Sequence, residues 1–104
     1  SLRRGAAEAL ELIAHGDYKS SQVVGRRVEE ISLPKGTTIG AIVRQLGQPA
    51  AGHSDDQAVE REVQVIIAHH DTVIEPGDHV IVFVVNKRMV SKIEKLFQVG
   101  VGFL

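Results

Sequence analysis

The side chains of this sequence that are suited to chemistry are mainly histidines and carboxylates in its second half. Residue types that bind zinc and related ions occur at five positions: His53, His69, His70, Asp71 and His79. Because neighbouring side chains on a strand point to opposite faces, His69 and His70 could reach one ion only at a bulge. His53 stands in a polar segment whose geometry nothing fixes. We therefore expect ordinary surface histidines and no metal site.

Motifs for catalysis and nucleotide binding are missing from the sequence. The chain has no cysteine, and none of its serines stands in the strained elbow G-x-S-x-G of a nucleophile. Neither G-x-G-x-x-G nor a Walker A sequence occurs, so no dinucleotide or triphosphate site of these kinds is encoded. The sequence thus predicts a domain that is not an enzyme and has no cofactor of its own.

The charge of the chain does not favour a nucleic-acid partner. Lys and Arg number 12 against 13 Asp and Glu, which gives a formal net charge of -1 at pH 7. A charge of that size attracts no polyanion. Four basic residues gather near the C-terminus around Glu94: Lys87, Arg88, Lys92 and Lys95. A solvated helix face explains them more simply than an anion or lipid site does.

Length and composition indicate one globular domain. The 104 residues are 43% hydrophobic and 24% charged, which is ordinary for a single domain. A domain this small buries only about 60 to 65% of the surface that its unfolded chain exposes, so we expect a partner surface to complete it. No run reaches the roughly 18 to 20 apolar residues needed to cross a bilayer. The chain begins at Ser1 rather than at Met, as a piece of a larger protein would.

Hydrophobic spacing predicts a helix at each end of the domain. The first spans 1–16, where the one-sided stripe consists of Leu2, Ala6, Ala9, Leu10 and Ile13. The second spans 87–97 with Asn86 as its N-cap, and its stripe consists of Met89, Val90, Ile93, Leu96 and Phe97. The apolar tail over 99–104 is expected to pack on its own domain, with contact to another chain as the alternative.

The body over 20–85 is predicted to be rich in strands. We expect a short strand at 23–24 and one helical turn within 26–31, then strands over 37–44, 63–68 and 79–85, with helix as the alternative for 37–44. A long polar loop is expected over 47–62. Pro76-Gly77 suits the centre of a type II turn, because glycine accepts a positive φ. This order predicts a single α+β domain over 1–104, a small mixed sheet flanked by N- and C-terminal helices.

Several stretches in fixed order carry a resemblance to a known family. They are Val23 to Ile31, Leu33 to Gly36, Ile39 to Arg44, and Asp71 to Phe83 with its turn Glu75-Pro76-Gly77-Asp78. This ordered set resembles the C-terminal domain of the family that regulates conductance of K+. The opening L-R-R-G-x-x-E-A and the ending V-x-K-I-E-K-L-F-Q are similar to the last such domain in regulatory proteins of Trk-type potassium uptake.

The resemblance implies a cytosolic regulatory role. Domains of this kind pair with their twins, and some relatives bind a small regulatory ligand between subunits. The resemblance also implies a parent ring that is peripheral to the inner face of the cell membrane and docks on the membrane-embedded Trk channel subunit. NAD or ATP is expected only in separate nucleotide-binding domains, whose glycine-rich fingerprint is missing here.

For a subunit interface the residues expected are Val24, Ile39 and Ile42, together with some aliphatic residues of 81–85. Alternate members of these strands must instead form the core. Two other functions stay open: a structural assembly module without a ligand, and a freestanding sensor of a metal ion or an anion. Stabilisation by a ligand would separate a sensor from a purely structural module.

Overall fold

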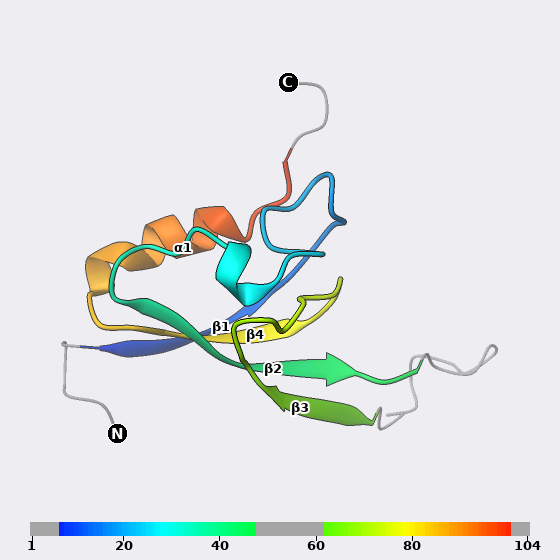
Figure 1. Ribbon diagram of the computed structural model, residues 1–104. Helices are drawn as coiled ribbons and strands as arrows, with labels where there is room; N and C mark the ends of the chain where they lie inside the picture. The colour runs from blue at the N-terminus through cyan, green and yellow to red at the C-terminus, as the bar shows by residue number, and fades with distance from the viewer. Residues whose placement is uncertain (1–6, 48–61, 101–104) are drawn as a thin grey trace, which may run out of the picture.

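The fold is an antiparallel sheet covered on one face by a helix and loops (Figure 1). The computed structural model describes residues 7–47 and 62–100. Its strands follow the order β1-β4-β2-β3 across the sheet, with bounds β1 Glu8–Ile13, β2 Thr37–Gln45, β3 Val63–Ile67 and β4 His79–Val84. The 3-10 turns η1 Val28–Glu30 and η2 Lys87–Met89 and the helix α1 Val90–Leu96 complete the domain. The α+β prediction is confirmed.

The N-terminal helix predicted over 1–16 is wrong, because its described part contains the strand β1. Leu10 and Leu12 stand opposite Val82 and Val80 of β4 in the register of the sheet. These apolar cross-strand pairs outweigh the helical propensity of a segment rich in Ala, Leu and Glu. The first six residues of the predicted helix lie outside the described part of the chain.

The strands predicted over 37–44, 63–68 and 79–85 are confirmed, but the sheet is antiparallel rather than mixed. β4 pairs antiparallel with both β1 and β2, and β2 pairs antiparallel with β3. Parallel neighbours need a crossover connection that is usually a helix. Among the described residues between the strands, η1 is the only helical element. Most of the loop predicted over 47–62 lies outside the described residues.

The short strand predicted at 23–24 is also wrong, since both valines lie in a turn. The hydroxyl oxygen of Ser21 accepts hydrogen bonds from the N–H groups of Val23 and Val24, each at 3.0 Å. A serine hydroxyl that satisfies backbone donors locally stabilises a turn in place of a strand. Both valines nevertheless belong to the core. The helical turn predicted within 26–31 is confirmed as η1.

A β-bulge at Gly40 decides which side chains of β2 reach the core. The register of β2 on β4 shifts between Ile39 and Ala41. On a regular strand, residues 39 and 42 would face opposite sides. The extra residue turns both Ile39 and Ile42 to the covered face, where each is buried. A Cβ atom at position 40 would overlap the ring of Phe83, so glycine is the residue that fits there.

The C-terminal helix predicted over 87–97 is confirmed as the continuous pair η2 and α1. The Asn86 side chain accepts a hydrogen bond from the Arg88 N–H at 2.9 Å, as expected of an N-cap. Ile93 and Phe97 from the predicted stripe are buried, and Met89, Val90 and Leu96 pack against the core. Figure 1 shows α1 and η1 on the same side of the sheet.

Replacing Ile93 by Ala should lower the free energy of unfolding by about 2 to 5 kcal/mol, because a fully buried side chain would leave a cavity under α1. Urea unfolding followed by circular dichroism measures this loss. Ser91→Ala, on the exposed side of the same helix, is the matched control and should change stability by less than about 0.5 kcal/mol. Equal losses in the two variants would contradict the packing of α1 on the sheet.

Candidate functional site

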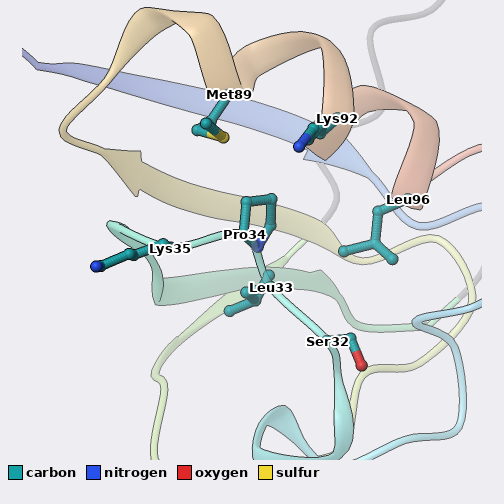
Figure 2. A pocket seen from close by; sticks show the side chains of 7 residues that line it. All are labelled: Ser32, Leu33, Pro34, Lys35, Met89, Lys92 and Leu96. Carbon is teal, nitrogen blue, oxygen red and sulfur yellow. The ribbon is translucent and has the colours of Figure 1, made fainter.

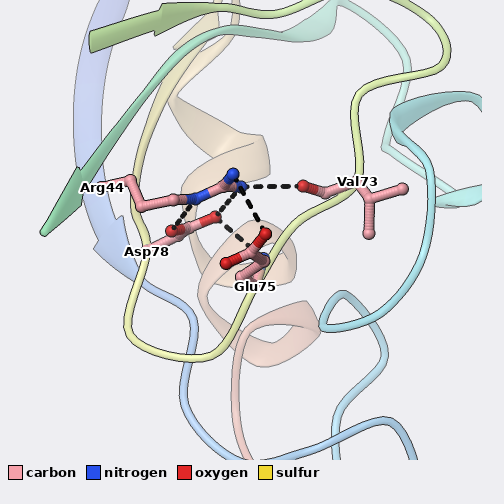
Figure 3. Close-up of polar contacts among 4 residues, drawn as sticks. All are labelled: Arg44, Val73, Glu75 and Asp78. Atoms are coloured by element: carbon pink, nitrogen blue, oxygen red, sulfur yellow. Dashed lines mark hydrogen bonds and ion pairs between the residues drawn. The ribbon is translucent and has the colours of Figure 1, made fainter. Parts of the chain in front are cut away.

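A buried carboxylate organises the turn before β4. Asp78 is only 1% exposed, and the Arg44 guanidinium from β2 donates to its two oxygens, at 3.0 Å from Nε and 2.8 Å from Nη2. Figure 3 shows Arg44 between this carboxylate and the carbonyl oxygen of Val73, which accepts from Nη2 at 3.0 Å. The paired N–H groups of an arginine fit the two oxygens of a carboxylate, which makes this contact strong and directional.

The same carboxylate also holds the turn itself. Asp78 accepts a hydrogen bond from the Glu75 N–H at 2.8 Å, and its own N–H donates to the Glu75 carbonyl at 3.1 Å. Gly77 has φ 87°, so the predicted turn with Pro76-Gly77 at its centre is confirmed. The Asp78 carboxylate, by accepting hydrogen bonds, raises the pKa of the Arg44 guanidinium, while burial acts in the opposite direction. These contacts fix β2 to the start of β4.

A groove lies between α1 and the segment before β2. Its volume is about 370 Å³, within the range of small-molecule sites. Figure 2 shows Met89, Lys92 and Leu96 along one side and the segment 32–35 along the other. Leu33 and Pro34 supply further apolar surface, and Lys35 supplies a second ammonium group. An apolar wall with two cations suits an organic anion that has a flat apolar part.

The opposite face of the sheet, which we call the outer face, is apolar. The strand register places nine apolar residues on it: Ala9, Ile13, Ala41, Val43, Val63, Val65, Ile67, Ile81 and Phe83. Val65 and Ile67 are 63 and 65% exposed. Figure 1 shows no described helix or loop covering this face. Large exposed apolar patches mark interaction surfaces on soluble proteins.

The ionisable side chains that the strands place on the outer face are paired with each other. Glu11 of β1 and His79 of β4 lie among the apolar residues, since His79 stands between Ile13 and Val43 in the register, and Glu11 Oε2 is 2.6 Å from His79 Nδ1. A carboxylate and an imidazole at this distance share a hydrogen bond. The outer face therefore has no ionisable strand residue without a partner among the described residues.

The three residues predicted for a subunit interface lie in the core of the domain. Val24, Ile39 and Ile42 are 2, 5 and 0% exposed. A second chain docking on this conformation would meet the outer face instead, so the interface role of these three stays a prediction that burial does not favour. Of the outer face, sequence reasoning included only the stretch 81–85, which contains Ile81 and Phe83, because apolar residues occupy both sides of the central strands. The alternation of Val63, Val65 and Ile67 was the feature that could have revealed it.

The candidate metal ligands are not brought together. Among residues 7–47 and 62–100, no three His, Asp or Glu side chains are placed to hold a metal ion. His70 lies in a turn, with Nδ1 at 3.6 Å from Glu29 Oε1. His69 and Asp71 lie beside it and are exposed, His79 contacts Glu11, and His53 lies outside the described part.

Comparison with known proteins identifies the relatives of this chain. No family model matches it. The chain is 54% identical over 103 residues, 99% of its length, to the Trk system potassium uptake protein TrkA of Halomonas elongata. It is 53% identical over its whole length to TrkA of Vibrio alginolyticus, and 39% identical over its whole length to TrkA of Haemophilus influenzae. This chain is a homologue of the C-terminal part of TrkA.

The match to TrkA confirms the resemblance inferred from the ordered motifs. The chain spans 19% of the length of these TrkA relatives, so the name of a potassium uptake protein belongs to much longer proteins. No helix in the described part of the chain is long and apolar enough to cross a membrane.

Replacing Asp78 by Asn should lower the free energy of unfolding by about 3 kcal/mol, because the mostly buried Arg44 guanidinium would lose the charged partner that is buried with it. Glu75→Gln is the matched control, since Glu75 pairs with the same guanidinium at 3.1 Å but its side chain is 57% exposed. It should cost less than about 1 kcal/mol. Urea unfolding at neutral pH measures both, and similar losses would refute the central role of Asp78.

Proposed function

We propose that this domain is a regulatory and assembly module of a Trk-type potassium-uptake protein, and that two copies associate through the outer face of the sheet. The main support for this proposal is the uncovered apolar outer face, because a small domain gains stability when a partner removes such a surface from water. The names of the TrkA relatives supply the link to potassium uptake.

A second copy is the occupant that fits the chemistry of this face. In a two-fold dimer the same patch meets itself, so the patch must be complementary to itself. An apolar face satisfies this condition, whereas a face with several charges of one sign would repel its copy. Glu11 and His79 contact each other within the chain, so a facing copy need not supply partners for them. Sheets that pack face to face lie about 10 Å apart with their strands nearly aligned.

The size of the outer face predicts a weak dimer for the isolated domain. Four strands about 4.8 Å apart, with about six residues of about 3.4 Å each along their paired length, span a face of roughly 19 by 20 Å. Stable interfaces bury about 800 Å² on each partner. The outer face is smaller than this, so association should depend on protein concentration, and other parts of the parent protein would strengthen it.

Such a module regulates because ligand binding shifts a conformational equilibrium, and it catalyses no reaction. A ligand that binds one arrangement of two domains more tightly shifts the parent assembly toward that arrangement. We propose that the membrane-embedded Trk channel subunit senses this shift from the cytosolic side. Nucleotide binding would belong to other domains of the parent protein.

Val65→Asp should shift the domain toward monomer in sedimentation velocity over a dilution series. Val65 is 63% exposed, so the substitution should leave the fold intact while placing a charge in the apolar contact. Ser91→Asp adds the same charge on the helix side of the domain and should leave association unchanged. A folded Val65→Asp variant that sediments like the parent chain would exclude the outer face as the interface.

The groove beside α1 supports a second part of the proposal, the binding of a small regulatory ligand. Its apolar wall and its two lysines favour an organic anion with an aromatic or other flat part. Mononucleotides and cyclic dinucleotides have this chemistry and are the first compounds to test. The alternative of a ligand-free assembly module would leave the groove without an occupant.

A mononucleotide or cyclic dinucleotide that binds the groove should raise the thermal midpoint by several degrees when present at about one hundred times its Kd. Lys92→Gln should reduce this shift, because Lys92 lines the groove. Arg88→Gln removes the same charge from an exposed position that does not line the groove and should keep the full shift. If none of these compounds raises the midpoint, the assembly module is the better interpretation.

A further inference from the structure

A second hollow on the helix side of the sheet is lined by cations. It has a volume of about 470 Å³ and lies between the loop after β1 and the end of α1. Its charged lining residues are Lys19, Arg26 and Lys95, and no Asp or Glu lines it. The hollow shares no lining residue with the groove beside α1, so it is a separate place on the surface.

The guanidinium of Arg26 is held in place by the loop. Its Nη1 donates to the carbonyl oxygens of Ser21 at 2.8 Å, Val24 at 3.2 Å and Tyr18 at 3.3 Å. The guanidinium carbon also lies 4.3 Å from the centre of the Tyr18 ring, a favourable cation–π contact. All these hydrogen bonds use one nitrogen. Nε and Nη2 have no acceptor within the described residues, so their N–H groups remain for a ligand.

The loop that carries these groups is itself ordered by Asp17. The Asp17 carboxylate accepts hydrogen bonds from the N–H groups of Lys19 at 3.0 Å and Ser20 at 2.9 Å. The backbone hydrogen bond from Ser20 is the main cause of the lowered pKa of Asp17, so Asp17 is anionic near neutral pH. Gln22, which lines the hollow, has a backbone N–H with no acceptor in the described part of the chain. The hydrogen bonds to Asp17 thus order the loop beside the cations.

Like charges that converge on one hollow repel each other unless an anion joins them. Lys95 has no ion-pair partner among the described residues, whereas the charge of Lys19 acts on the nearby Asp17 carboxylate and contributes to its lowered pKa. Phosphate accepts several hydrogen bonds at once, and arginine and lysine are its usual partners. We propose that this hollow binds a small soluble phosphorylated molecule, with the phosphate between Arg26, Lys19 and Lys95. The volume accommodates a diphosphate or a phosphate ester of modest size.

The test is a titration of the 15N-labelled chain with inorganic phosphate, pyrophosphate and ADP, followed by amide chemical shifts. The expected result is saturable shifts at Lys19, Gln22 and Gly100, with pyrophosphate tighter than phosphate. Lys19→Gln and Lys95→Gln should each weaken binding about fivefold, the effect of one exposed charge contact. Arg88→Gln lowers the net charge equally at an exposed position outside the hollow and should leave the affinity unchanged.

Three results would overturn the proposal. One is saturable binding whose shifts map elsewhere on the chain. Another is an equal loss of affinity in Arg88→Gln and Lys95→Gln, which would indicate attraction to overall charge. The third is binding to vesicles of phosphatidylglycerol and phosphatidylcholine without binding of any soluble phosphate, which would assign these cations to a lipid surface. Circular dichroism of each variant ensures that only folded chains are compared.

Discussion

The ion pair between Arg44 and Asp78 is the contact on which the arrangement of the sheet depends. It joins the middle of the chain, at β2, to the turn that starts β4, which lies 34 residues further along. With this point fixed, β4 runs antiparallel between β1 and β2, and the bulge at Gly40 then determines which side chains of β2 face α1. A shift of one residue in the register of a strand would move its core side chains to the outer face. By holding the register, the same pair keeps these side chains in the core. Loss of either residue would leave the other largely buried without this charged partner, which is costly in a mostly apolar domain.

The three surfaces singled out for binding lie at different places on the molecule. The outer face is on the uncovered side of the sheet, whereas the groove and the cation-lined hollow are on the side of α1. Lys92 and Lys95 belong to the same helix but line different sites. Self-association therefore leaves both ligand sites open. Ligand and partner would influence each other through the core under α1, where Ile93 and Phe97 contact the inner face of the sheet.

The parts of the fold that the sequence predicted correctly are those set by local chemistry. Pro76-Gly77 specifies its turn by backbone conformation, and Asn86 specifies the start of its helix by a hydrogen bond two residues away. β1 could not be predicted, because a short segment rich in Ala and Leu fits a helical period as well as a strand period until Val80 and Val82 of β4 are beside it. Ile39 and Ile42 were expected at an interface because the bulge between them leaves no mark in hydrophobic spacing. The groove and the cation-lined hollow were missed since each joins segments that are far apart in the chain.

The two edges of the sheet differ in a way that limits how the sheet could be extended. Strand edges with unpaired N–H and C=O groups recruit further strands unless charges, prolines or a covering element prevent it. β1 has Glu8 and Glu11 along its length, whereas the five residues of β3 include no charged side chain and no proline. Growth of the sheet is thus favoured at one edge. A strand added at β3 would leave β1 as the opposite edge of the widened sheet, and the side chains of Glu8 and Glu11, which pair with Lys87 and His79 within the chain, hinder strand addition there.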